Sequence, residues 1–409
     1  MAATNVVWIG IDVGKASRHA AAVDADGQVL WSMKVPNDQH RAEELLSRAL
    51  TMASQADVEL RWAIDLTSAT AALLTTVLLA GGQHVLYVPG RAVNSMAAAF
   101  RGEGKTDAKD ARVIADTARM CHRELTHLKA PDELVVELTR LTAHRTDLMA
   151  DWVRGVNRLR ELLTSIFPAL ERSFDFSTRS ALILISGFCT PSELRAAGTE
   201  GLTAYLAENG AWRKSIDSMV RKALDAADQQ NLALPGEATT AMLAKRLARR
   251  LLDLDREIKD ITKMITARFR AHHQGAILES LLGMGPILGA EFLVATGGDA
   301  QGAFGTTGRR ASYAGLVPVP QDSGRVSGNL RRPKRYNRTL RRVFYMAAMT
   351  SLKADGPSRA FYDKKRNENK IHTQAVLALA RRLVDVVWAL LRDQRLFTPV
   401  PPEQLATAA

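Results

Sequence analysis

The sequence predicts an α/β domain at the N-terminus, a long helical region in the middle and a mainly α-helical domain at the C-terminus. Three observations support this prediction. Residues 5–89 hold short apolar runs separated by turn residues, two later stretches repeat apolar residues every three or four positions, and a glycine- and arginine-rich loop region precedes the last helices. A chain of 409 residues is also expected to form more than one domain.

Charge favours a nucleic-acid partner. The formal net charge is +12, and the run from Arg309 to Arg342 holds ten lysines and arginines but one acid, Asp322. Such a run would repel itself unless a polyanion lay against it, and a phosphate backbone is the natural candidate. No stretch approaches the roughly 20 apolar residues of a membrane span. We therefore expect a cytoplasmic, nucleoid-associated protein that does not contact membranes.

The N-terminal elements are expected in a definite order. By residue range, they are strands at 5–13, 19–28 and 29–36, a helix at 39–53, a strand at 58–65, a helix at 67–82 and a strand at 84–89. Three antiparallel strands followed by alternating helix and strand is the order of an RNase H-like α/β domain.

Four aspartates fall where such a fold can bring them together. Asp12 ends the first strand and Asp65 ends the fourth, while Asp107 and Asp110 lie one helical turn apart in KTDAKDARVIA. Four converging acids repel one another, and Mg²⁺ or Mn²⁺ is the usual reason for tolerating this. Such a metal can clamp a phosphate and lower the pKa of an attacking oxygen.

Two other interpretations of these residues stay open. Each acid taken alone could simply end a strand or face solvent on a helix. The stretch GIDVGK could also be a phosphate loop of an actin-like ATPase, although no second glycine-rich loop matches it.

The middle region contains two amphipathic stripes, from Leu134 to Ile166 and from Leu243 to Phe269. They predict either an antiparallel hairpin or a coiled coil between subunits. Residues 173–236 lie between them and are expected to form an inserted helical subdomain to which we assign no chemistry. The predicted domains are therefore 1–125 (RNase H-like), 126–275 (helical coiled-coil region), 276–398 (C-terminal domain) and 399–409 (flexible tail).

The C-terminal domain holds a candidate nucleophile in a basic loop. Ser323 precedes Gly324 in a segment rich in glycine and proline, so we expect it on an exposed turn, where serine is also a common turn former. Earlier in the domain, Gly283 and Gly285 indicate either a hairpin that aims backbone amides at a DNA phosphate or a tight turn that requires positive φ. The cationic residues expected to bind nucleic acid are Arg325, Arg331, Arg332, Lys334, Arg335, Arg338, Arg341 and Arg342.

The order of these motifs resembles that of the DEDD-type insertion-sequence transposases, which are related to the Piv invertases and described as bridge-RNA-guided recombinases. The residues that carry the resemblance are GIDVGK, the strand ending at Asp65, KTDAKDA, the GMGP turn, YAGLVP, Ser323-Gly324, NRTLRR and the closing helix.

The resemblance implies a RuvC-like (RNase H-like) domain, a coiled-coil region and a C-terminal transposase domain. It implies that Asp12, Asp65, Asp107 and Asp110 bind Mg²⁺ and that Ser323 recombines two DNA duplexes, donor and target, through phosphoserine intermediates. It also implies a guide RNA and a tetramer, a dimer of dimers, in which acids and serine come from different subunits.

The chain departs from the family pattern at two positions. Asp65 stands where glutamate is usual, which shortens the reach by one methylene, and Tyr336 replaces a glycine, so that turn is expected to differ. The main rival function is a RuvC-like metal-dependent nuclease or junction resolvase that uses water. Ser312 and Ser327 are fallback serine nucleophiles, Tyr336 and Tyr345 would serve a tyrosine-type enzyme, and an RNA-binding scaffold with inert acids is a non-enzymatic alternative.

Overall fold

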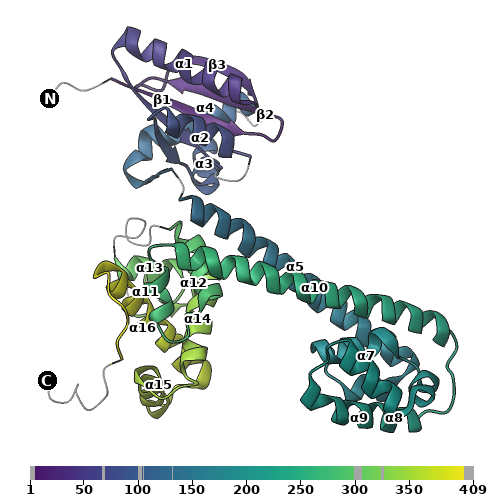
Figure 1. The fold of residues 1–409 in the computed structure, drawn as a ribbon. Coiled ribbons are helices and arrows are strands. Elements are labelled where there is room, and N and C mark those ends of the chain that lie inside the picture. The colour runs from purple at the N-terminus through teal and green to yellow at the C-terminus, as the bar shows by residue number, and fades with distance from the viewer. Residues whose placement is uncertain are drawn as a thin grey trace. The chain divides into compact units, whose positions relative to one another are not determined.

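The computed structural model describes residues 5–66, 70–99, 104, 106–130, 132–298, 306–323 and 327–399. The chain divides into two compact units, Met1–Pro131 and Asp132–Ala409 (Figure 1). Each unit has its own hydrophobic cores, and the two are taken in turn below.

Unit 1 is built on a mixed six-stranded sheet with the order β3-β2-β1-β4-β5-β6. The first three strands pair antiparallel, β1 pairs parallel with β4, and β4 pairs parallel with β5. The predicted antiparallel meander and the alternation of helix and strand after it are confirmed, whereas β6 and α3 were not predicted. The strands are β1 (Val6–Val13), β2 (Ser17–Val23), β3 (Val29–Pro36), β4 (Glu59–Ile64), β5 (His84–Tyr87) and β6 (Thr126–His127), and the helices are α1 (Gln39–Ala56), α2 (Ala72–Ala80), α3 (Gly90–Ala97) and α4 (Asp107–Cys121).

Residues of β1 alternate between the two faces of the sheet. Ile9 and Ile11 pack with residues of α1 and α2, whereas Trp8 packs with residues of α3 and α4. Because side chains along a strand alternate, Gly10 and Asp12 share the face of Trp8. A Cβ added to Gly10 would lie 2.2 Å from the carbonyl oxygen of Ala111, so α4 approaches the strand backbone closely at this glycine. Glycine at this position therefore allows α4 to lie against β1.

Unit 2 contains two long helices, α5 (Glu133–Ile166) and α10 (Glu237–Ala271), which lie side by side (Figure 1). Glu137 pairs with Arg268, His144 with Glu257 at 3.3 Å, and Gly155 faces Leu251. Partner numbers fall along α10 as they rise along α5, so the helices are antiparallel. Of the two predicted alternatives, the hairpin within one chain is present; a coiled coil between subunits stays a prediction.

The hairpin connects two separate cores. At the end where α5 finishes and α10 starts, the hairpin shares one core with the inserted helices. At the opposite end, it shares a second core with the C-terminal helices. The predicted helical character of the insert is confirmed. The inserted helices are α6 (Pro168–Ser173), α7 (Arg179–Gly187), α8 (Pro191–Glu208) and α9 (Ile216–Asp228). The C-terminal elements are α11 (Gly275–Ser280), α12 (Pro286–Thr296), α13 (Thr307–Tyr313), β7 (Val319–Pro320), β8 (Leu330–Arg331), α14 (Arg338–Ser351), α15 (Pro357–Asn367) and α16 (His372–Arg392).

The glycine pair before α12 behaves only in part as predicted. Gly283 has a φ of 90°, and a Cβ there would lie 2.2 Å from the carbonyl oxygen of Ala347 in α14. Gly285 instead has a φ of −70°, so positive φ was the wrong expectation for this residue. The close contact with α14 explains Gly283 as a packing requirement.

Within the described residues, no helix has both the length and the apolar character needed to cross a membrane. The predicted tail at 399–409 lies outside the described residues from position 400 onward.

Candidate functional site

Asp12 and Asp65 lie at the carboxyl ends of neighbouring parallel strands. Ile11 of β1 is paired with Ile64 of β4, so the next residue of each strand is one of the two acids. Ile64 packs with α1 and α2, while Ala63 packs with α4. Alternation therefore directs Asp65 to the α4 side of the sheet, which is also the side of Asp12.

Helix α4 brings two further acids to this face. Thr106 caps the helix by accepting a hydrogen bond from the Lys109 N–H at 3.2 Å, so Asp107 and Asp110 lie in the first turn. The close approach of α4 at Gly10 holds this turn near the end of β1. Acids are favourable at a helix N-terminus, which compensates part of their mutual repulsion.

The Asp65 carboxyl interacts electrostatically with Asp110. Burial raises the pKa of the Asp65 carboxyl; backbone N–H groups of Asp65 and Val13 lower it, and the negative charge of Asp110 raises it. The Oδ1 atom of Asp65 is buried and accepts no hydrogen bond from the described residues. A buried carboxylate oxygen without a donor, next to a second carboxylate, suits a hard divalent cation, which binds oxygen ligands.

Ser323 lies just beyond the stem of the β7–β8 hairpin. Within the stem, the Gln321 N–H donates to the Asn329 carbonyl at 2.8 Å, and the Asp322 carboxylate accepts from the Asn329 N–H at 3.0 Å. Ser323 is exposed. Its predicted exposed position is confirmed, while its role as a nucleophile stays a prediction.

The candidate nucleic-acid-binding residues differ in how accessible their cationic groups are to a phosphate. Arg341 is half-buried, donates to the Gly315 carbonyl at 3.1 Å and lies over the Tyr336 ring at 5.0 Å. Arg342 is exposed but forms an ion pair with the buried Glu291. Arg325 lies outside the described residues. The others, all exposed, are Arg331, Arg332, Lys334, Arg335 and Arg338.

Tyr336 stands where the family pattern has a glycine. Its side chain packs into the region of the cationic residues. Its ring lies against Gly315, where a Cβ would be 2.5 Å from the Tyr336 Cγ. A hydrogen bond from Arg332 lowers the pKa of the Tyr336 phenol, and the charges of Arg341 and Arg338 act in the same direction. The turn that follows is intact, because Asn337 caps α14 by accepting from the Leu340 N–H at 2.9 Å.

Arg310, by contrast, is not part of the basic surface. It is fully buried, and its guanidinium lies 4.5 Å from the Trp388 ring centroid. Burial lowers the pKa of Arg310 to about 10. At this position, the arginine run therefore contributes a side chain to the protein core and not to a phosphate-binding surface.

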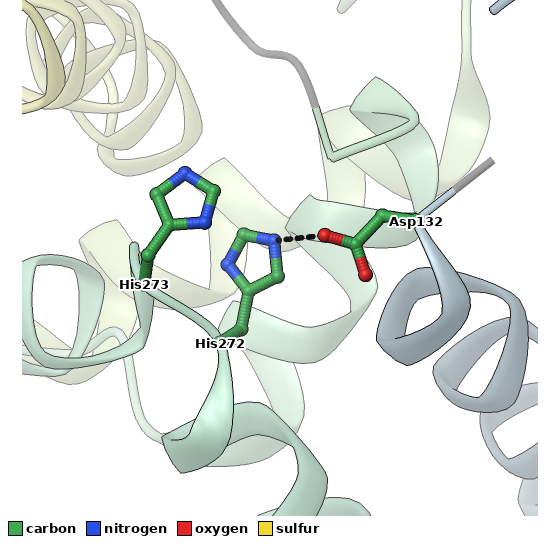
Figure 2. Close-up of side chains that lie close together, drawn as sticks. All are labelled: Asp132, His272 and His273. Atoms are coloured by element: carbon green, nitrogen blue, oxygen red, sulfur yellow. Dashed lines mark ion pairs between the residues drawn. The ribbon is translucent and has the colours of Figure 1, made fainter. Parts of the chain in front are cut away.

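A second cluster, which sequence reasoning missed, joins Asp132, His272 and His273 (Figure 2). Among the described residues, the potential metal-ligand atoms of these three all lie within 4.8 Å of one another, whereas no three of the four predicted acids, Asp12, Asp65, Asp107 and Asp110, come that close together. The Asp132 Oδ1 caps α5 by accepting from the Leu134 N–H at 2.8 Å, while its Oδ2 lies 3.6 Å from the His272 Nε2. The cluster thus connects the start of α5 to the end of α10.

The protonation of His272 does not fit a metal site. Its Nδ1 accepts a hydrogen bond from the Gln274 N–H at 3.1 Å, so in the neutral ring the proton is on Nε2, the atom directed at Asp132. A metal ligand would need a lone pair on that Nε2. We therefore interpret the cluster as a clasp between helix ends. The cap position of Asp132 could have been found from sequence, but its histidine partner depends on the antiparallel register.

Stability of the clasp is expected to depend on pH. The pKa of His272 is lowered, mainly by burial and also by His273, with Asp132 acting in the opposite direction. Because the unfolded chain binds the proton more readily, stability is present above about pH 6.5 and is lost as pH falls below it, by up to about 1.4 kcal/mol per pH unit. His272→Gln removes the titrating imidazole and should flatten this dependence in urea unfolding monitored between pH 7.5 and 5.5 (about one unit either side of the free histidine pKa). An unchanged slope in His272→Gln would contradict the assignment.

Comparison with known proteins agrees with both halves of this description. Residues 9–168 match a transposase family of the DEDD type and IS110 kind, a range that includes all four acids. Residues 275–363 match the transposase IS116/IS110/IS902 family, a range that includes Ser323 and the arginines.

Full-length relatives extend these matches over nearly the whole chain. A protein of insertion element IS116 from Streptomyces clavuligerus is 51% identical over 397 residues, which is 97% of each chain. A protein of insertion element IS900 from Mycobacterium paratuberculosis is 48% identical over 394 residues, covering 96% of this chain and 97% of the relative. The mini-circle putative transposase for IS117 from Streptomyces coelicolor is 26% identical over 414 residues. The chain therefore belongs to the IS116/IS110/IS902 family of insertion-sequence transposases, enzymes that act on DNA.

Proposed function

We propose that this transposase cuts and rejoins DNA with Ser323 as nucleophile and with Asp12, Asp65, Asp107 and Asp110 as ligands for Mg²⁺ or Mn²⁺. The observation that carries the proposal is the placement of Asp12, Asp65 and the first turn of α4 on one face of the sheet, with a buried Asp65 oxygen that accepts no hydrogen bond from the described residues. The exposed serine beside cationic residues supports the second half of the proposal.

The proposed reaction is a pair of phosphoryl transfers. The Ser323 Oγ forms a bond to the scissile phosphorus, the bond from that phosphorus to a deoxyribose oxygen breaks, and the proton lost by serine is balanced by one gained on the leaving oxygen. A DNA hydroxyl then attacks the phosphoserine, which restores a phosphodiester and frees the serine. The number of phosphoester bonds is unchanged, so rejoining needs no ATP.

The protein's own groups would prepare this step. Arg331, Arg332, Lys334, Arg335 and Arg338 are exposed around the hairpin and can bind phosphate oxygens through charge-assisted hydrogen bonds. When bound at the acids, a divalent metal would supply Lewis-acid polarisation of a phosphate oxygen. Asp65 and Asp110 would hold it, because the charge of a metal would offset the burial and, to a lesser degree, the repulsion from Asp110 that raise the pKa of Asp65.

We also propose that the enzyme acts as a dimer of dimers with a structured guide RNA, and that the acids and the serine acting on one phosphate come from different subunits. The resemblance to bridge-RNA-guided recombinases supports this proposal, as does the basic surface around the hairpin. Sequencing of RNA that co-purifies with the transposase tests it. We expect an RNA that derives from DNA flanking the element; recovery of only bulk cellular RNA would contradict guidance.

A RuvC-like metal-dependent nuclease or junction resolvase is the second candidate, because the acids alone could direct water to a phosphate. Trapping separates the two. A DNA substrate with a nick close to the cut site loses its short strand after attack, which prevents rejoining and accumulates any covalent adduct. Peptide mass spectrometry is expected to locate that adduct on Ser323. A cleaved substrate without adduct would favour the nuclease, and an adduct on Tyr336 or Tyr345 would favour a tyrosine enzyme.

A further inference from the structure

A cavity of about 680 Å³ opens at the base of the hairpin that carries Ser323. Its floor is apolar and is formed by Leu316 and Val317, which follow α13, and by Leu377 and Ala378 of α16. These floor residues are half-buried, so they are partly accessible. The volume is within the range of pockets that hold small ligands, roughly 300–1,000 Å³.

Arginines surround this apolar floor. Arg331 comes from strand β8 of the hairpin, Arg341 from α14 and Arg381 from α16. With Arg332, which directly follows Arg331, four cationic side chains therefore line one hollow. An apolar peptide or lipid tail would gain nothing from that charge, whereas a nucleotide combines a flat apolar base with an anionic phosphate.

Two of these arginines are held in position by the protein. The Arg341 Nη1 donates to the Gly315 carbonyl at 3.1 Å, and its guanidinium lies over the Tyr336 ring. The Arg381 Nη1 donates to the Asp385 Oδ1 at 2.7 Å. Because each guanidinium has five N–H donors, both retain donors for a phosphate after these bonds are made.

The cavity lies beside the proposed nucleophile along the hairpin. Arg331 pairs with Val319 in the stem, and Ser323 follows three residues after Pro320, at the end of the stem. Three extended residues span about 10 Å, which corresponds to about three nucleotides along a strand of B-form DNA. A nucleotide in the cavity would thus belong to the same stretch of DNA that Ser323 attacks.

We propose that this cavity binds one DNA nucleotide that is unstacked from the duplex near the cut site, with its base on the Leu316, Val317 and Leu377 floor and its phosphate on Arg331 and Arg341. The proposal rests on the assignment of the serine hairpin as the DNA-cleaving element. Extraction of one base would fix the register of the strand relative to Ser323 and distort the backbone within a few nucleotides of the phosphate that Ser323 attacks.

The test uses DNA in which 2-aminopurine, a base that fluoresces when unstacked, replaces one base at a time across the cut site. The full-length transposase is used as purified, with any bound RNA, and carries Ser323→Ala so that the DNA stays intact. We expect a several-fold rise in fluorescence at one position. Ala378→Leu, which fills the cavity, should abolish that rise and weaken DNA binding by roughly tenfold.

Two further variants complete the test. Ala360→Leu, the same substitution at an exposed position of α15, should keep the rise, and Arg331→Gln, which removes a proposed phosphate ligand, should reduce it. The proposal is overturned if no position shows a rise, if Ala378→Leu retains it, or if the signal arises only from 2-aminopurine placed in RNA. Because the readout is base unstacking on uncut DNA, it is independent of adduct trapping; an adduct on Ser323 without a rise would reject the cavity alone.

Discussion

Replacing Ser323 with alanine is expected to abolish strand cleavage and covalent adduct formation while leaving DNA binding within about a factor of two. The hydroxyl is the only group removed, and Ser323 is exposed, so the fold should not change. Loss of a covalent nucleophile typically lowers turnover by about 10⁴-fold or more, which is below detection for a slow recombinase. Gel assays of strand cleavage, together with binding measured on the same DNA, provide the readout.

Ser327→Ala is the matched control for this prediction, because Ser327 is also exposed and lies in the same hairpin. It should retain cleavage close to the wild-type level. If Ser323→Ala still cleaves, water or another side chain is the nucleophile, and if only Ser327→Ala is inactive, the assignment belongs to the neighbouring serine.

Replacing Asp65 with asparagine is expected to separate stability from activity. Asp65 is half-buried with its Oδ1 atom shielded from solvent, and burial together with the charge of Asp110 raises its folded-state pKa. A raised carboxyl pKa means that stability falls as pH rises through the titration of this group, starting near its ordinary value of about 3.9. Asp65→Asn removes this cost, so at neutral pH without metal the first unit should unfold at the same temperature as wild type or higher.

Cleavage by Asp65→Asn should nevertheless fall by roughly 10²- to 10³-fold, because the amide is a weak ligand for Mg²⁺. Added Mg²⁺ should raise the unfolding temperature of wild type but not of Asp65→Asn, since a ligand stabilises only the state that binds it. Asp26→Asn, an exposed acid of the β2–β3 turn, is the control and should change neither measurement. Full activity in Asp65→Asn would remove this residue from the metal site.

The alternation of side chains along the strands made much of the position of the acids predictable. Asp12 and Asp65 end strands whose apolar residues alternate, so their position at strand ends followed from sequence. That both acids face α4, however, depends on which residues pack with which helix, and Gly10 gave no sign of the contact with Ala111. Strand β6 was missed because its two residues, Thr126 and His127, are too few to show any pattern.

Long-range pairing explains the rest of what sequence could not predict. Arg310 and Arg342 look like their neighbours in the basic run, yet one is buried against Trp388 and the other pairs with Glu291. His272 likewise becomes distinctive only when α10 lies antiparallel to α5 and brings it to Asp132. In each case the partner is distant in the chain, and no local rule identifies it.

The α5–α10 hairpin also limits how the gene can change length. Each helix contacts the other along most of its length, so a single-residue insertion in α5 would rotate every later contact by about 100° around the helix axis. Insertions of about seven residues in both helices, two turns each, would restore the facing surfaces. Single insertions should instead be tolerated in the connection between α9 and α10. Length differences among relatives are therefore expected to occur in paired steps within the hairpin and singly outside it.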